Sequence, residues 1–309
     1  MSSDLVTPRP VPQPERPQEQ EESIDYRALA ERHGLMISGA RPTFPVYLRQ
    51  IWDRRHFIVA FSRAKMTAQY SQARLGQLWQ VVTPLLNAAV YYLIFGVLLQ
   101  SKRGVEDYVP FLVTGVFVWT FTLTSVTSGV KAISGNLGLI RALHFPRASL
   151  PLALCIQQFQ QLLFSMIVLV LVLLGFGVPP TWHWFLVVPA LLLQSVFNVG
   201  LALVVARVGS HTPDLAQVMP FIMRTWMYLS GVMYSLADKA KHMPEVVQTL
   251  LPLNPAAVYI DLMRFALIDS FHADKLPPNV WLVAILWSLV IGAGGFVFFW
   301  SGEETYGRG

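Results

Sequence analysis

Six long apolar segments constrain the structure of this chain more than any other feature. Five of the six contain no charged residue. A helix of about 20 apolar residues crosses a hydrocarbon core of about 30 Å, and in that core the backbone must satisfy its own hydrogen bonds. We therefore predict an all-α integral membrane protein with six transmembrane helices. The segments cover about 81–99, 109–130, 149–175, 183–206, 215–236 and 279–301.

The composition supports a membrane protein and argues against metal or disulfide chemistry. The chain is 54% hydrophobic and 13% charged, whereas about 25% of the residues of soluble domains are charged. Cys155 is the only cysteine, so we expect a buried packing residue and no disulfide framework. The pairs His211–Asp214 and His272–Asp274 have no further ligands nearby in sequence. We therefore predict no catalytic residue and no metal site.

Four regions follow from the distribution of apolar and polar residues. Residues 1–25 contain repeated prolines among Gln, Glu and Ser, which is typical of a disordered tail, and they lack the apolar segment of a signal peptide. Residues 26–78 are predicted to form a cytosolic or interfacial helical segment. Residues 79–302 are the predicted six-span domain, and 303–309 are a predicted cytosolic tail.

An amphipathic helix is predicted before the first span, within residues 45–75. Aromatic and aliphatic residues alternate there with arginines and a lysine, as in helices that lie at the surface of a membrane with anionic headgroups. On an ideal helix Arg55 projects into the apolar side. A break in the helix or a snorkelling arginine is therefore expected at this position.

The short connections between the spans predict the orientation in the membrane. Cations are concentrated before the first span and in the connection from the second to the third span, which holds Lys131, Arg141 and Arg147. Because cytosolic connections carry the excess of Lys and Arg, we predict cytosolic N- and C-termini in the bacterial plasma or inner membrane.

The stretch from 238 to 278 predicts an extracytoplasmic re-entrant helical hairpin between the fifth and sixth spans. It contains two apolar patches of about 13 residues, too short to cross a bilayer. Pro252 and Pro255 would separate the two helices. The acids at Asp261 and Asp269 are expected on a solvated face.

Three separated stretches carry a resemblance to a known family. They are YSQARLGQLWQVVTPLL (70–86), the run from Phe111 through NLGLIRALHFPRASLPL (111–152), and LNPAAVYIDLMRFAL (253–267). Together they resemble the membrane (permease) subunit of type-2 ABC transporters that export lipid-linked polysaccharides such as O-antigen, teichoic acid and galactan. The resemblance implies a homodimeric channel driven by two copies of a separate ATP-binding cassette subunit. The proline-rich N-terminal extension lies outside it.

ATP hydrolysis is expected in the partner subunit, because the 309 residues contain no G-x-x-x-x-G-K-[ST] phosphate loop. We therefore predict no enzyme activity and no cofactor in this chain, with ATP and Mg²⁺ bound by the partner subunit. The other expected partners are membrane lipids and a lipid-linked glycan, and no nucleic acid is expected.

The resemblance also implies roles for three groups of residues. The connection between the second and third spans would be the coupling helix that contacts the ATPase. A positively charged topological loop is the alternative, but it would not explain Leu139, Ile140 and Phe145 if they are exposed. The implied coupling residues are Asn136, Leu139, Ile140, Arg141, His144, Phe145, Pro146 and Arg147.

The residues before the first span would lie at the cytosolic entrance for the diphosphate of the glycan. Arg63, Lys65 and Arg74 could bind it through charge-assisted hydrogen bonds, or could equally bind anionic lipid. The implied entrance residues are Arg63, Lys65, Tyr70, Arg74, Leu75, Gly76 and Trp79.

The implied hairpin residues are Asn254, Pro255, Tyr259 and Arg264.

Polar and aromatic residues within the spans are candidates for the channel. Arg224 lies about 15 Å into the fifth run, where a charge costs at least about 2.5 kcal/mol without a partner or water. Gln157 and Gln161 share a helix face, where amides hold helices together or line a sugar path. The candidate channel residues are Tyr91, Tyr92, Trp119, Phe121, Arg224, Trp226 and Tyr228.

These observations favour export of a lipid-linked polysaccharide or polyol-phosphate polymer. A drug or lipid exporter permease of the same superfamily is one alternative. An integral-membrane glycosyltransferase or acyltransferase is another, and it would require a catalytic acid or histidine pair at a membrane face.

Overall fold

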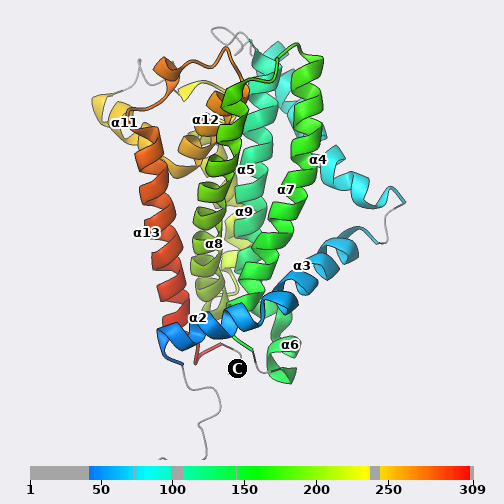
Figure 1. Ribbon diagram of the computed structural model, residues 1–309, viewed down its shortest axis with the longest axis vertical. Coiled ribbons are helices and arrows are strands. Elements are labelled where there is room, and N and C mark those ends of the chain that lie inside the picture. The colour runs from blue at the N-terminus through cyan, green and yellow to red at the C-terminus, as the bar shows by residue number, and fades with distance from the viewer. Residues whose placement is uncertain (1–41, 72–73, 99–106, 144, 237–243, 307–309) are drawn as a thin grey trace, which may run out of the picture. The chain divides into compact units, whose positions relative to one another are not determined.

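The structure of the protein is a computed structural model that describes residues 42–71, 74–98, 107–143, 145–236 and 244–306 (Figure 1). All regular elements in these ranges are helices. The predicted N-terminal tail (1–25), residues 26–41 and His144 lie outside the described residues.

Four described helices are long and apolar enough to cross a membrane. They run side by side in Figure 1, and each corresponds to one of the predicted apolar runs within a few residues. The four helices are α5 (Tyr108–Val130), α7 (Ser149–Gly175), α8 (Val187–His211), which continues from the 3-10 turn η4 (Trp182–Leu186), and α13 (Val280–Ser301).

The remaining two apolar runs form shorter or irregular helices. The first is α4 (Trp79–Tyr91), which has Pro84 inside it and continues as the π-helical segment η2 (Tyr92–Leu98). The fifth is α9 (Leu215–Leu229), which ends where Gly231 adopts a φ of +63°. Proline and π-helical turns both interrupt the regular i→i−4 ladder, and an α9 of 15 residues is shorter than a bilayer span. Six spans therefore remain a prediction.

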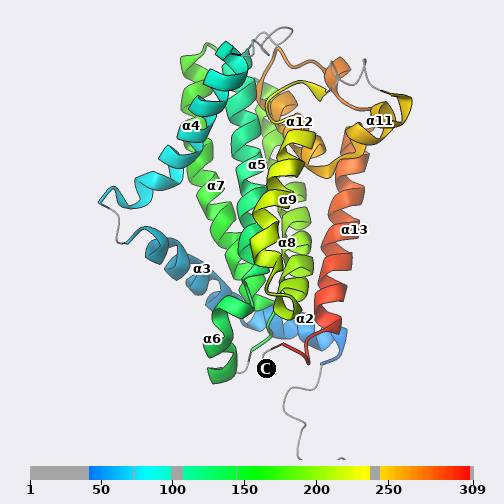
Figure 2. The ribbon, with the colours of Figure 1, turned by 180° about the vertical axis from the view of Figure 1, so that it is seen from behind.

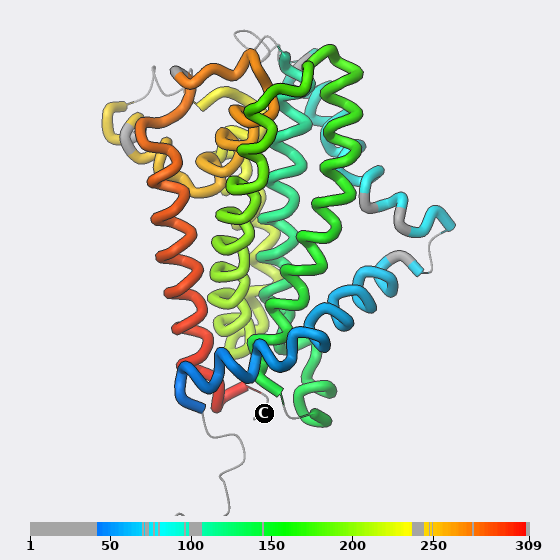
Figure 3. The backbone as a smooth tube through the Cα atoms, viewed as in Figure 1, coloured from blue at the N-terminus to red at the C-terminus, as the bar shows by residue number. Residues whose placement is uncertain are grey.

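The amphipathic segment forms two helices, α2 (Phe44–Asp53) and α3 (Arg55–Tyr70). The helix is interrupted between them at Arg54, which confirms the helix break expected beside Arg55. The guanidinium of Arg55 donates to the carbonyl of Trp52 at 3.1 Å and lies over the Trp52 ring. The two helices run obliquely across one end of the spans (Figure 3).

The spans have two distinct ends, which both ribbon views show (Figures 1 and 2). The α6 end holds α2, the short helix α6 (Leu137–Ala142) and the last described residues. The α12 end holds α11 (Glu245–Leu250) and α12 (Pro255–Leu267). The 3-10 turns are η1 (Gly76–Leu78), η3 (Ser134–Asn136), η5 (Leu251–Leu253) and η6 (Ala273–Lys275).

Helices α8 and α13 approach each other through glycines. A Cβ built on Gly200 would lie 2.1 Å from the carbonyl oxygen of Ile291, and one on Gly295 would lie 2.3 Å from the carbonyl oxygen of Gly200. Small residues allow backbones to pack this closely in membranes, where no hydrophobic force drives helices together. This contact fixes α13 on α8.

Candidate functional site

Helix α6 lies in the connection between α5 and α7, as the coupling helix was expected to do. The Asn136 side chain, at the start of this helix, donates to the carbonyl of Ala132 at 2.8 Å. The expectation that Leu139, Ile140 and Phe145 are exposed is wrong, because all three are half-buried against the chain's own core. The exposed residues of this helix are Gly138, Arg141 and Ala142, and Leu143 directly after it is also exposed.

A buried carboxylate joins three elements at the α6 end. The Tyr47 hydroxyl donates to Glu303 Oε2 at 2.6 Å, and the backbone N–H of Arg147 donates to Oε1 at 2.8 Å. The backbone N–H of Ala148 donates to the Tyr47 hydroxyl at 3.2 Å, and the Arg147 guanidinium donates to the carbonyl of Glu303. We call these four residues the Glu303 cluster. Burial raises the pKa of Glu303, and the Arg147 N–H, the Tyr47 hydroxyl and the Arg147 charge oppose that effect.

The Glu303 cluster alters two sequence-based expectations. Arg147 was expected to contact a partner, but its backbone and side chain both bind Glu303 of the same chain. Residues 303–309 were expected to be a tail, but Glu303 and Tyr306 are buried. The end of α13, the start of α7 and helix α2 are therefore joined at one point.

The candidate entrance residues surround the connection from α3 to α4. Arg63 and Arg74 are exposed, whereas the Lys65 ammonium lies 5.3 Å from the Phe61 ring centre. Gly76 has a φ of +51° with open space around it, which suits glycine. Leu75 and Trp79 are exposed. The side chain of Tyr70 lies outside the described part of the structure.

The candidate channel aromatics separate into two groups. Trp119 of α5 meets Trp226 of α9 edge-to-face at 5.6 Å, and the Tyr91 hydroxyl lies 3.7 Å from the sulfur of Met227. These contacts join α4, α5 and α9. Phe121 packs against Phe159 of α7, on another side of α5.

Tyr92, Arg224 and Tyr228 complete the candidate channel set. Tyr92 packs against Tyr108, with ring centres 6.3 Å apart. Arg224 and Tyr228 are exposed on α9, and Arg224 makes no hydrogen bond or ion pair with any described residue. The cation inside this apolar helix is therefore directed out of the single chain.

The glutamines of α7 join helices and also line a groove. Gln157 donates to Gln69 of α3 at 2.9 Å, and Gln158 lies 3.4 Å from the Ser128 hydroxyl of α5. These contacts join helices, as one of the two expectations had it, and a sugar path along these glutamines stays a prediction. The groove has a volume of about 340 Å³, and we call it the amide groove. It is lined by Gln69, Thr83, Pro84, Asn87, Thr120, Thr124, Thr127, Ser128, Gln157, Gln158 and Gln161.

The candidate hairpin residues anchor the α12 end. Asn254 accepts from the Trp226 indole at 2.8 Å and from Ala256 N at 3.2 Å, and its amide donates to the carbonyl of Leu229 at 3.0 Å. This one side chain caps α12 and binds the end of α9, while Pro255 occupies the first helical position. Tyr259 is buried, and its hydroxyl lies 3.0 Å from the carbonyl of Ala284 on α13.

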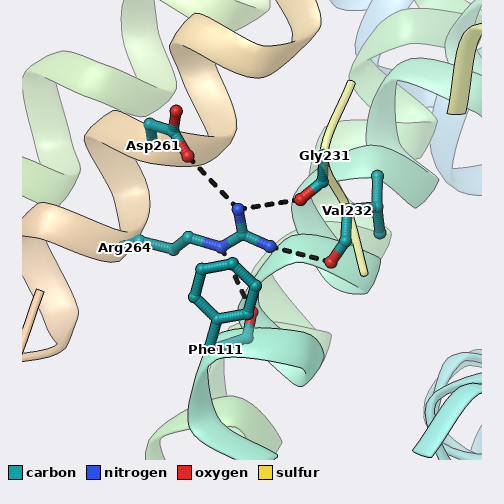
Figure 4. Close-up of polar contacts among 5 residues, drawn as sticks. All are labelled: Phe111, Gly231, Val232, Asp261 and Arg264. Atoms are coloured by element: carbon teal, nitrogen blue, oxygen red, sulfur yellow. Dashed lines mark hydrogen bonds and ion pairs between the residues drawn. The ribbon is translucent and has the colours of Figure 1, made fainter. Parts of the chain in front are cut away.

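Arg264 is fully buried at the centre of the α12 end (Figure 4). Its guanidinium donates to the carbonyls of Gly231 at 3.0 Å and Val232 at 2.7 Å, and to Asp261 Oδ1 at 3.2 Å. It also donates to the carbonyl of Phe111 at 3.3 Å and lies over the Phe111 ring. The expectation of a solvated Asp261 is wrong, because this carboxylate is the buried partner of Arg264.

The i, i+3 spacing of Asp261 and Arg264 in an apolar helix was the signal that sequence reasoning missed. Glu303 carried no such signal, because its partners Tyr47 and Arg147 are 256 and 156 residues away. Among the described residues no group of three His, Cys, Asp or Glu could hold a metal ion. Cys155 is buried, as expected.

Comparisons with known proteins define the class of this membrane chain. Residues 56–268 match the family described as ABC-2 type transporter, and this match covers more than half of the chain. The chain belongs to the membrane proteins of the ABC-2 transporter family, and it is a multi-pass membrane protein.

Several curated relatives match most of the chain. The O-antigen export system permease protein RfbA of Myxococcus xanthus is 25% identical over 259 residues, which is 84% of this chain and 94% of the relative. The polysialic acid transport protein KpsM of Escherichia coli is 21% identical over 74% of this chain and 87% of its own length. The capsule polysaccharide export inner-membrane protein CtrC of Neisseria meningitidis is 24% identical over 84% of this chain and 96% of its own length.

Proposed function

We propose that this chain is the permease subunit of an ATP-driven exporter that moves a lipid-linked polysaccharide or polyol-phosphate polymer out of the cytosol. The observation that carries the proposal is that these relatives, all polysaccharide export or transport proteins by name, align with most of this chain. In the proposed orientation the α6 end faces the cytosol and the α12 end faces outward. The cations Lys131, Arg141 and Arg147 support that orientation, because cytosolic connections carry an excess of Lys and Arg.

The proposed motor is a separate ATP-binding subunit that docks on α6. The sequence contains no phosphate loop, and α6 presents Arg141 and the 50% exposed Leu143 beyond the ends of the spans. An exposed cation on a short helix and an exposed leucine directly after it suit a protein partner. In this proposal ATP and Mg²⁺ belong to the partner, and the Glu303 cluster transmits displacement of the α6–α7 connection to α2 and α13.

The proposed channel lies between two copies of this chain. Support comes from Arg224, because a cation exposed within an apolar helix requires water or a polar group nearby. A path between two α9 helices would provide both, and Trp226 and Tyr228 on the same helix would offer aromatic faces to a passing sugar chain. The exposed Arg63 and Arg74 would attract the diphosphate at the entrance.

The α6 docking proposal is tested by co-purification and transport. We expect the double variant Arg141→Glu/Leu143→Asp to lose the ATP-binding subunit during purification and to stop polymer export, because it reverses a charge and inserts another in the docking face. The matched control is Leu250→Asp, an exposed leucine at the α12 end, which should retain the partner. Retention of partner and export by the α6 double variant would contradict the proposal.

A further inference from the structure

The amide groove combines a polar lining with a complete lack of charge. Its lining residues come from α3, α4, α5 and α7, and they contribute hydroxyls and amides but no Asp, Glu, Lys, Arg or His. A volume of about 340 Å³ far exceeds the roughly 10–15 Å³ that one water occupies. The groove can therefore accommodate an organic group.

Three helices place their polar stripes around this groove. Thr83 and Asn87 are four residues apart on α4, Thr120 and Thr124 are four residues apart on α5, and Gln157 and Gln161 are four residues apart on α7, so each pair lies on one helix face. Hydroxyls and amides are costly in an apolar span unless they are satisfied. Their convergence on one space indicates a site for a polar group.

The threonine hydroxyls on α5 donate to carbonyls of the same helix, and their oxygens can still accept hydrogen bonds from a ligand. Thr120 donates to the carbonyl of Val116 at 2.6 Å, Thr124 to that of Thr120 at 2.8 Å, and Thr127 to that of Leu123 at 2.8 Å. Each oxygen keeps lone pairs that can accept from a ligand hydroxyl. Gln194, a glutamine of α8 outside the groove, is buried in the core and binds the carbonyl of Val118 and the Thr122 hydroxyl.

A small cavity adjoins the groove. It has a volume of about 20 Å³, which is room for about one water, shares five of the groove's lining residues and adds Phe117, Phe121, Leu162 and Ser165. Aromatic and aliphatic groups suit the C–H faces of a sugar ring, while neutral acceptors suit its hydroxyls. A phosphate would instead require cations, which the lining does not contain.

We infer that the amide groove binds the uncharged sugar headgroup of a membrane-anchored glycolipid, an inference that rests on the proposed function for the identity of the natural glycolipid. Thr127 and Thr120 lie three and ten residues from the end of α5, or about 5–15 Å into the span at 1.5 Å per residue. A headgroup in this groove would thus sit below the membrane surface, beside the α3–α4 connection that carries the exposed Arg74. Its phosphates would remain outside the groove.

A thiol-protection experiment tests the inference directly. Cys155, the only cysteine, is replaced by Ala, Thr124→Cys is introduced, and the full-length chain is placed in phosphatidylcholine nanodiscs in its native assembly. Labelling by a small maleimide is measured with dodecyl maltoside or dodecylphosphocholine at equal concentrations below micelle formation. The two probes have the same alkyl chain and differ in the headgroup.

We expect dodecyl maltoside to slow labelling about tenfold at a concentration about ten times its Kd, and dodecylphosphocholine to leave the rate nearly unchanged. Equal protection by both probes would show a general lipid site and overturn the inference. Lack of protection by dodecyl maltoside, or a Cys at 124 that never reacts, would also overturn it.

A transport measurement separates this inference from the proposed function. Thr124→Val should reduce polymer export, whereas Thr114→Val, on the same helix but outside the groove, should not. If export of polymer does not depend on this chain at all, the proposed function fails, while the protection by dodecyl maltoside is unaffected. If export depends on the chain but dodecyl maltoside gives no protection, only the groove inference fails.

Discussion

Three buried ionic residues, Arg264 with its partner Asp261 and Glu303, stand out among single side chains of the interior. Arg264 donates hydrogen bonds to three backbone carbonyls and to Asp261. Glu303 accepts hydrogen bonds from the Tyr47 hydroxyl and from the backbone N–H of Arg147. Buried charges are stable only when they are paired and hydrogen-bonded. Arg264 and Glu303 therefore fix local structure.

Replacing Arg264 should destabilise the α12 end strongly. Arg264→Met leaves Asp261 unpaired and the carbonyls of Gly231 and Val232 without a donor, and breaking a buried pair costs about 3–5 kcal/mol. We expect a clearly lower thermal unfolding midpoint in detergent. The double variant Arg264→Met/Asp261→Leu should recover part of the loss, because it removes the isolated carboxylate. An unchanged midpoint for the single variant would refute this role.

The raised pKa of Glu303 predicts a pH dependence of stability. A carboxyl that holds its proton more tightly in the folded state contributes stability below its ordinary pKa of 4.5, and that contribution is lost as pH rises through the raised value. The stability of the wild type relative to Glu303→Gln should therefore fall as pH increases above 4.5. Unfolding midpoints of both proteins across this range measure the effect. A wild type that becomes more stable relative to Glu303→Gln as pH rises would mean that the pKa is lowered instead.

At the scale of elements, the most informative positions are those where helices end. Helix α9 ends at Leu229, directly before Ser230 and Gly231. Asn254 caps the start of α12, and the Asn254 side chain binds the end of α9. Asn254 thus determines where the hairpin starts and how it attaches to α9, the helix that carries Arg224.

Loss of the Asn254 side chain should loosen this attachment. Asn254→Ala removes a helix cap, which costs about 0.5–2 kcal/mol, and leaves the Trp226 indole without its acceptor. We expect a lower unfolding midpoint and a red shift of tryptophan emission. Asn254→Asp keeps the cap and the indole acceptor, so it should show the smaller change. Identical spectra for wild type and Asn254→Ala would argue against the attachment.

At the scale of the whole molecule, local pattern predicted the elements and missed their long-range partners. Hydropathy located four spans, and the position of Arg55 on the apolar side of an ideal helix predicted the break between α2 and α3. Spans and helix breaks can be predicted in this way because they depend only on neighbouring residues. The short α9, the buried Asp261 and the buried Glu303 depend on contacts between distant segments. The amide groove was visible only as glutamines on α7, since its other walls come from three further helices.

Depletion of this chain in its own host, followed by analysis of lipid-linked glycans on each side of the membrane, tests the central claim most directly. The proposed export function predicts that full-length lipid-linked polymer accumulates in the cytosolic leaflet and that polymer outside the cell declines. The accumulated material would also identify the cargo. Unchanged glycan pools on both sides would contradict the claim and favour another cargo, and truncated precursors alone would indicate a membrane enzyme.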